Sequence, residues 1–212
     1  MIPGASPGLD SGESIPDDLL AGEFASASIP AELRPYVLEI NAYAERCTRS
    51  LGDRRLRRDE CSGARVAVIF ELGPPLRVIA LRGQESRRYA RGFVSGPSGS
   101  FAGTEHAGRQ SGIQMNLTLP GAALLFGVPL SEYFGRALPL AFEELLPAER
   151  DLSERLFHAG DSSANPWPAR FAVLLEWLRG RLAVGLPRRA QPGFHAVQSV
   201  LASMERWEMS VM

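Results

Sequence analysis

The spacing of hydrophobic residues changes near Pro120, and this change constrains the fold more than any other feature of the sequence. Before Pro120, short apolar segments with two-residue alternation are separated by Gly, Pro and polar turns, as in β-strands. After it, apolar residues recur at helical spacing. Strands grouped first and helices grouped second predict an α+β fold, in contrast to the alternating units of a parallel sheet.

Five segments before Pro120 have strand character: YVLEINAYAE (36–45), RVAVIFEL (65–72), LRVIAL (76–81), RRYARGFV (87–94) and GIQMNLTL (112–119). In the last segment, apolar Ile113 and Leu117 alternate with polar Gln114 and Asn116. One face of this strand should therefore pack on a core, while the other meets water or a polar cavity. The stretch from Val66 to Phe70 is apolar on both faces, which predicts a central strand.

Four segments after Pro120 predict helices: GAALLFG (121–127), LSEYFG (130–135), residues 147–159, and NPWPARFAVLLEWLRGRLA (165–183). The last is the clearest, because its apolar residues form one stripe and most of its charges lie off it. The stripe consists of Trp167, Phe171, Leu174, Leu175, Leu178 and Leu182. A further amphipathic helix is expected within AVQSVLASMERWEMSVM (196–212).

Composition excludes several functions. The sequence contains no Lys, since all 23 basic residues are Arg, so Schiff-base chemistry and a phosphate-loop lysine are ruled out. A net charge of −1 gives no global attraction to nucleic acid or to an anionic membrane. The start has no signal-peptide pattern and no apolar run spans a bilayer, so a cytoplasmic location is expected, without a membrane partner. Cys47 and Cys61 do not make a disulfide framework.

Motifs for catalysis are not found. The Gly-rich stretch 96–104 has no Lys after its last Gly and is interpreted as a turn-rich connection. The basic cluster RRLRR (54–58) is interpreted as a solvated loop, because acidic residues flank it and no aromatic residues interleave it. His106 follows Glu105 directly, and adjacent strand residues point to opposite faces. The histidines lack zinc-ligand spacing and no nucleophile motif is present, so we expect neither an enzyme nor a cofactor nor a metal.

Several segments together carry a resemblance: IPAELRPYVLEINAYAE, ARVAVIFELGPPLRVI, GFVSGPSGSF, GIQMNLTLPGAALLFGVPLSEYFGRALPLAFEELL, LSERLFHA and WPARFAVLLEWLRGRL. In this order, from about Ile29 to Leu182, they resemble the N-terminal part of a branch of the AraC-type transcriptional regulators. The resemblance implies a small cupin-like β-barrel followed by helices, which senses a small molecule or mediates dimerisation. In such regulators a C-terminal pair of helix-turn-helix modules then binds DNA.

Residues 1–28 are rich in Gly, Pro, Ser, Asp and Glu without sustained periodicity, which predicts a disordered leader. The resemblance implies three further parts: a β-barrel or sandwich sensing domain (29–120), a helical dimerisation part (121–186), and a linker with the start of a truncated helix-turn-helix region (187–212). The expected partners are a small-molecule effector and a second copy of the chain, and DNA only through the C-terminal modules. Inward side chains of the barrel would contact the effector, with Phe70, Phe93 and Met115 as candidates and His106 as a polar contact.

Alternatives remain open. The same aromatic and Met residues fit plain core packing, which is their usual role. The helical stripe also fits an interaction protein that lacks DNA-binding modules and sequesters regulator partners without sensing a ligand. A cupin-like enzyme or binding protein is a third interpretation, disfavoured by the spacing of the histidines.

Overall fold

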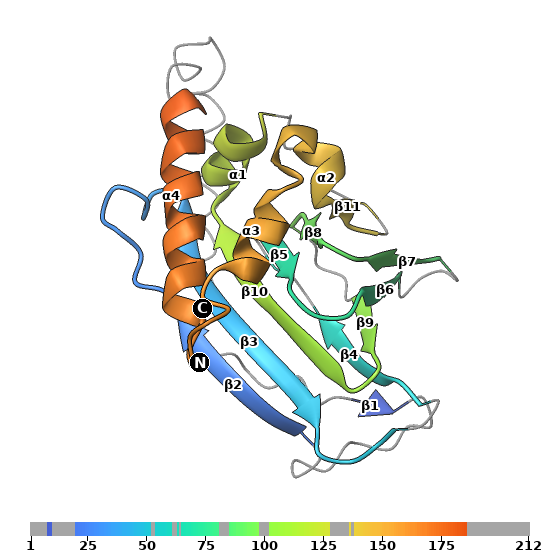
Figure 1. Cartoon of the computed structure of the whole chain (residues 1–212). Coiled ribbons are helices and arrows are strands. Elements are labelled where there is room, and N and C mark those ends of the chain that lie inside the picture. The colour runs from blue at the N-terminus through green and yellow to red at the C-terminus, as the bar shows by residue number, and fades with distance from the viewer. Residues whose placement is uncertain are drawn as a thin grey trace, which may run out of the picture.

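The computed structural model describes residues 8–9, 20–51, 54–60, 63, 65–80, 85–97, 102–127, 136 and 138–185. Among the described residues, all helices follow Thr118 and every strand except the two-residue strand Leu140–Ala141 precedes it, so the expected order is confirmed apart from this short strand (Figure 1). All strand pairs are antiparallel. The fold class is therefore α+β, as predicted.

The strands form two sheets. The larger has the order β11 (Leu140–Ala141), β8 (Gly92–Ser95), β5 (Val66–Glu71), β10 (Arg109–Leu117), β3 (Val37–Cys47) and β2 (Leu20–Ser26). The smaller has the order β1 (Gly8–Leu9), β4 (Leu56–Glu60), β9 (Ala102–His106), β6 (Leu76–Ala80) and β7 (Ser86–Tyr89). Within the described ranges the two sheets keep separate edges, so the arrangement is a sandwich and not the closed barrel that was the other expectation.

The helices are α1 (Leu119–Phe126), α2 (Phe142–Leu145), the 3-10 turn η3 (Pro147–Glu149), α3 (Leu152–His158) and α4 (Trp167–Gly185). The helix expected over 147–159 is thus divided into η3 and α3, while the helix expected over 130–135 lies outside the described residues, as does 186–212. No helix in the described part of the chain combines the length and the apolar character that crossing a bilayer requires.

The main core lies between the larger sheet and the helices. Central strand β5 is buried along its whole length, as its sequence predicted. Ile113, Met115 and Leu117 of β10 belong to this core, and so do the buried residues of α4. The Phe70 ring packs edge-on against Phe142, with ring centroids 5.1 Å apart, and against Trp177 at 6.3 Å. These three aromatic rings join β5 to α2 and α4.

Helix α1 begins where β10 ends, and short-range contacts fix its start. The Thr118 hydroxyl accepts a hydrogen bond from the Gly121 amide at 3.0 Å and caps the helix. Gly121 is needed there, because a Cβ atom would lie 2.1 Å from the Tyr36 carbonyl oxygen. At the other end, Gly127 adopts a left-handed conformation with φ of 66°, which a glycine accommodates without strain.

Three segments that the sequence assigned to a leader, a loop or a turn belong to strands in the structure. Residues 20–26, placed in a disordered leader, form β2 and pair with β3, whereas residues 1–7 and 10–19 lie outside the described residues. The RRLRR cluster and the Gly-rich stretch enter β4 and β9, which pair with each other. In each case pairing with a strand distant in sequence decides the conformation, and local composition does not contain that information.

We expect Leu174→Ala on α4 to lower the free energy of unfolding by about 2–5 kcal/mol, since Leu174 is fully buried against the larger sheet and its truncation leaves a cavity. Urea denaturation followed by circular dichroism measures the change. Glu176→Ala on the exposed side of α4 is the control and should change it by less than about 0.5 kcal/mol. Equal effects of the two substitutions would contradict the packing described for α4.

Candidate functional site

The two faces of the larger sheet have different partners. Phe70 points toward the helices, whereas its neighbour Ile69 and the adjacent Phe93 pack against Leu76, Val78 and Tyr89 of the smaller sheet. Because side chains alternate along a strand, Glu71 shares the face of Ile69. This face, turned toward the smaller sheet, is the inner face of the sandwich.

The inner face is apolar on one half and polar on the other. Its apolar half lies on β5, β8 and β11, where Ile69, Phe93 and Ala141 pack. The polar half, called here the polar inner face, consists of Glu39, Asn41, Tyr43 and Glu45 of β3, Glu71 of β5, and Gln110, Gln114 and Asn116 of β10. The strand register sets these residues side by side on one face. Inner faces of sandwiches are usually apolar, so this half is not built for plain core packing.

Two groups of hydrogen bonds order the polar inner face. At one end, Glu39 accepts hydrogen bonds from Asn41, Asn116 and Arg65. At the other end, Glu45 forms an ion pair with Arg58 at 2.7 Å and accepts from the Gln110 amide at 2.9 Å. Arg58 belongs to β4 of the smaller sheet, so this ion pair bridges the two sheets.

Tyr43 and Glu71 meet between these two groups. The Tyr43 hydroxyl lies 3.4 Å from Glu71 Oε1, although β10 separates their strands. The residue between them in register is Gly112. A Cβ atom at Gly112 would lie 2.7 Å from the Tyr43 hydroxyl oxygen and 2.7 Å from the Phe70 carbonyl oxygen. Gly112 therefore gives the Tyr43 ring the space to reach across β10.

Glu71 is a buried carboxyl group with incomplete hydrogen bonding. Only 4% of its surface is exposed, and burial raises its pKa to about 8 despite the contact with Tyr43. Its Oε2 atom has no hydrogen-bond partner among the described residues. Glu71 also borders a surface groove toward α3, where Arg91 pairs with Glu154 at 3.1 Å. Unpaired buried carboxyl oxygens are costly, so such an atom requires a water molecule or a bound ligand as its partner.

His106 is the second buried polar group without partners. It lies on β9 opposite Leu56 and is 4% exposed. Burial, and next the positive charge of Arg58, lower its pKa to about 4, so the imidazole is neutral at physiological pH. Neither ring nitrogen has a hydrogen-bond partner in the described ranges. A neutral imidazole offers one donor and one acceptor to a bound molecule.

The structure separates the four site residues expected from the sequence. Phe93 lies on the apolar half of the inner face. His106 lies close enough to Arg58 and Glu45 for their charges to shift its pKa. Phe70 and Met115 instead face the helices and belong to the main core, so the expectation that they point inward is wrong. Ligand contact stays a prediction for Phe93 and His106. Strand β5 is apolar on both faces, and its sequence did not reveal which face turns inward.

Sequence reasoning missed the residues that make the polar inner face, above all Tyr43, Glu45, Glu71 and Arg58. The two-residue alternation of polar groups along β3, from Glu39 to Glu45, was the available signal. In the described part of the chain, no three His, Cys, Asp or Glu side chains cluster as a metal site. Cys47, half-buried at the end of β3, is a free thiol, and Cys61 lies outside the described residues.

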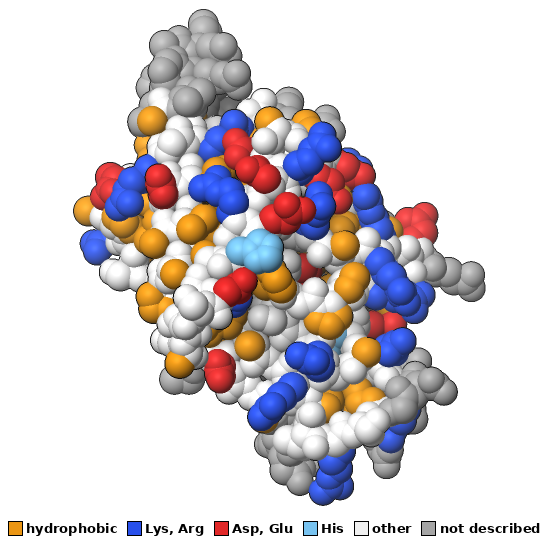
Figure 2. Space-filling view, viewed as in Figure 1, with side chains coloured by type: hydrophobic (Ala, Val, Ile, Leu, Met, Phe, Trp, Pro, Cys, Tyr) orange, Lys and Arg blue, Asp and Glu red, His pale blue; other side chains and the backbone are white. Residues whose placement is uncertain are grey.

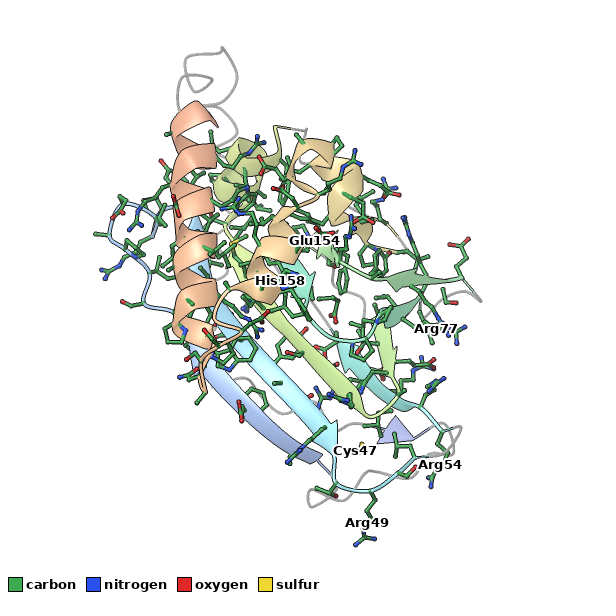
Figure 3. All side chains as sticks on the ribbon, viewed as in Figure 1. Cys47, Arg49, Arg54, Arg77, Glu154 and His158 are labelled. Atoms are coloured by element: carbon green, nitrogen blue, oxygen red, sulfur yellow. The ribbon has the colours of Figure 1, made fainter. Side chains whose placement is uncertain are left out.

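Other charged residues lie away from the polar inner face. Arg49 and Arg54, in the connection from β3 to β4, point away from the body of the protein, and Arg77 projects from β6 (Figure 3). His158 on α3 is 70% exposed in its side chain and pairs with Asp161. Acidic and basic side chains are interspersed over the helical side (Figure 2).

Comparison with solved structures gives only weak similarities. The EutQ protein of Clostridium difficile is 12% identical with a TM-score of 0.33, covering 49% of this chain and 67% of that chain. A cupin domain from Bordetella pertussis is 9% identical with a TM-score of 0.30, covering 46% and 93%. An RmlC-like cupin protein from Desulfovibrio desulfuricans is 12% identical with a TM-score of 0.32, covering 48% and 85%. At such TM-scores these similarities carry no argument about fold or function.

No family model matches the sequence, and no curated protein matches it. The structure itself shows an α+β sandwich. Some buried polar atoms between its two sheets lack hydrogen-bond partners among the described residues.

We expect Gly112→Ala to destabilise the protein by about 1–3 kcal/mol, because the added methyl group meets the Phe70 backbone as well as the Tyr43 ring. Thermal denaturation measures the loss. Gly180→Ala on α4 is the control, since no atom lies within 4 Å of the added methyl group. It should leave stability unchanged or raise it, as Ala favours a helix by about 1 kcal/mol over Gly. A neutral Gly112→Ala would contradict the crossing of Tyr43 over β10.

The pKa shifts predict how stability depends on pH. Between pH 6.5 and 8 the folded-state Glu71, with its pKa of about 8, keeps a proton that the unfolded chain has lost. His106 is neutral in the folded state and about half protonated in the unfolded chain at pH 6.5, so it offsets part of the effect of Glu71 only near pH 6.5. The folded state then binds more protons, so stability should fall as pH rises from 6.5 to 8, by up to about 1.4 kcal/mol per pH unit.

Urea denaturation across this pH range tests the expectation. Glu71→Gln should remove the fall, whereas the exposed Glu143→Gln should retain it. If the two variants have the same pH dependence, Glu71 is not the titrating group.

Proposed function

We propose that this chain is a sensory domain that binds a small-molecule effector between its polar inner face and the facing side chains of Arg58 and His106 on the smaller sheet. One observation carries the proposal: the buried His106 ring and Glu71 carboxyl have polar atoms without partners in the described ranges, although both residues are 4% exposed. A buried polar atom left unpaired costs about 1–3 kcal/mol. A protein retains that cost most readily where the atoms serve a bound molecule.

We further propose that the domain belongs to a transcriptional regulator of the AraC type and dimerises. The sequence resemblance and the order of strands before helices support this assignment. Effector binding would act on the helices through β3 and β10, because these strands present polar residues to the inner face and apolar residues to the helices. DNA would be bound by helix-turn-helix modules and not by the two sheets. The chain would act by binding, without catalysing a reaction.

His106→Leu tests the binding proposal. The substitution should raise the melting temperature, because it removes two unpartnered ring nitrogens from a buried position, and should weaken effector binding at least tenfold. A metabolite library screened by thermal shift identifies the effector, and titration calorimetry measures the affinity. His158→Leu on the exposed side of α3 is the matched control and should bind normally. An effector whose affinity is the same for both variants would exclude the polar inner face as its site.

The regulatory proposal needs a separate test. The full product of the gene should bind the DNA next to that gene in a mobility-shift assay, with an affinity that the effector changes. Sedimentation should report a dimer of this chain. A dimer that forms mixed dimers with other regulators and binds no metabolite would favour the alternative function, an interaction protein that sequesters its partners.

A further inference from the structure

We propose that the effector is a small organic cation, with a guanidinium or ammonium group held between aromatic rings and carboxylates of the polar inner face. The inference rests on the proposed function and names the chemical class of the ligand at the same site.

Acidic groups outnumber basic groups around Tyr43. Its pKa lies well above the usual range, mainly because the residue is buried, and further because the carboxylates of Glu71, Glu45 and Glu60 lie nearby. The basic group among them is Arg58, which Glu45 already binds at 2.7 Å. The groups that face this region are Tyr43 and Glu45 from β3, Arg58 and Glu60 from β4, Glu71 from β5 and His106 from β9. Arg91, across the groove that Glu71 borders, is already paired with Glu154. Once Glu71 is ionised, three carboxylates face one arginine in this region, which favours a cation over an anion.

An exposed aromatic ring, that of Phe24, lies beside one of these carboxylates. Phe24 of β2 is paired in register with Tyr43 and is 68% exposed, the largest exposed fraction among the described large hydrophobic residues. Its ring lies next to Glu45: a Cβ atom built on Gly22 would lie 3.0 Å from the Phe24 ring and 3.2 Å from the Glu45 side chain. Aromatic faces attract organic cations, more strongly when the cation is desolvated. An aromatic ring with adjacent carboxylates is the combination that such a ligand requires.

Two buried polar side chains, Glu71 and His106, have atoms without hydrogen-bond partners among the described residues. Glu71 Oε2 is an acceptor without a donor in the described ranges, and a neutral His106 has one ring nitrogen that accepts. The N–H groups of a guanidinium or ammonium group are donors suited to the ionised Glu71 carboxylate and to the accepting ring nitrogen of His106. An anionic ligand would find a donor in the His106 N–H, but it would face the carboxylates of Glu45 and Glu60 directly.

Cation binding should be coupled to proton release. Glu71 keeps its proton below a pKa of about 8, and the ionised form binds a cation more tightly. Affinity should therefore rise by up to about tenfold per pH unit below pH 8 and level off above it. His106, with a pKa of about 4, and Cys47, whose pKa is raised by burial, do not titrate in this range.

The experiment uses methylguanidinium chloride as the probe and N-methylurea, a neutral molecule of nearly the same shape, as its comparison. Both are titrated into the intact chain at constant ionic strength, at pH 6.5 and pH 8.5, with binding followed by calorimetry. We expect methylguanidinium to bind at least tenfold more tightly than methylurea at pH 8.5, and more weakly at pH 6.5.

Two pairs of variants locate the probe. Glu71→Gln should weaken methylguanidinium binding at least tenfold and abolish its pH dependence, whereas the exposed Glu143→Gln should retain both. Phe24→Ala should weaken binding several-fold, whereas Leu38→Ala, which removes an exposed apolar side chain at the other end of β3, should have no effect. Phe24 is largely exposed, so its substitution leaves the core intact and keeps the test valid if Glu71→Gln fails to fold.

The outcomes separate the two proposals. If methylurea or acetate binds as tightly as methylguanidinium in a manner that depends on His106, the organic cation is excluded and the sensory function stands. Absence of methylguanidinium binding, together with a neutral or anionic hit from the metabolite library, likewise excludes the cation and retains the sensory function. If no probe and no library member binds, both proposals fail.

Discussion

The packing of the larger sheet against the helices supports the rest of the structure. Phe70, Phe142 and Trp177 join the centre of that sheet to α2 and α4, and the fully buried residues of β10 and α4 extend the same core. Because this apolar layer lies outside the sandwich, the space between the sheets does not have to supply all of the hydrophobic stabilisation. The inner face can then be polar on β3 and β10 without loss of the fold.

Contacts hold the side chains of the polar inner face in place, but not all of their polar atoms have hydrogen-bond partners among the described residues. The ion pair between Glu45 and Arg58 bridges the two sheets, and Tyr43 reaches Glu71 across Gly112. These contacts fix the side chains before any ligand arrives, which lowers the ordering cost of binding. His106 and one oxygen of Glu71 stay without partners in the described ranges. A buried hydrogen-bond network in which some atoms stay unpaired lowers the stability of the folded state. Natural proteins retain such networks chiefly at functional sites.

The same two strands connect this surface with the helices. Along β10, Gln114 and Asn116 lie on the polar inner face, while Ile113 and Met115 contact the core under the helices. A shift of β10 or β3 caused by a ligand would therefore reach α1 and α4 without an intermediate element. A sensory domain whose helices communicate with further modules would need this kind of link, in which the ligand favours one of two packing arrangements.

The sequence by itself determined the class of fold, the strands β3, β5, β6 and β10, the helix α4, and the two-sided character of β10, because hydrophobic periodicity is a local property that reports which face is buried. Only the tertiary structure decided that Leu20–Ser26, RRLRR and part of the Gly-rich stretch are strands, since their pairing partners are distant in sequence. It also decided that Phe70 and Met115 face the helices, while Glu71 turns inward to meet Tyr43. Successive side chains of a strand point to opposite faces of the sheet. Which face packs against the helices and which against the second sheet depends on how the layers pack together.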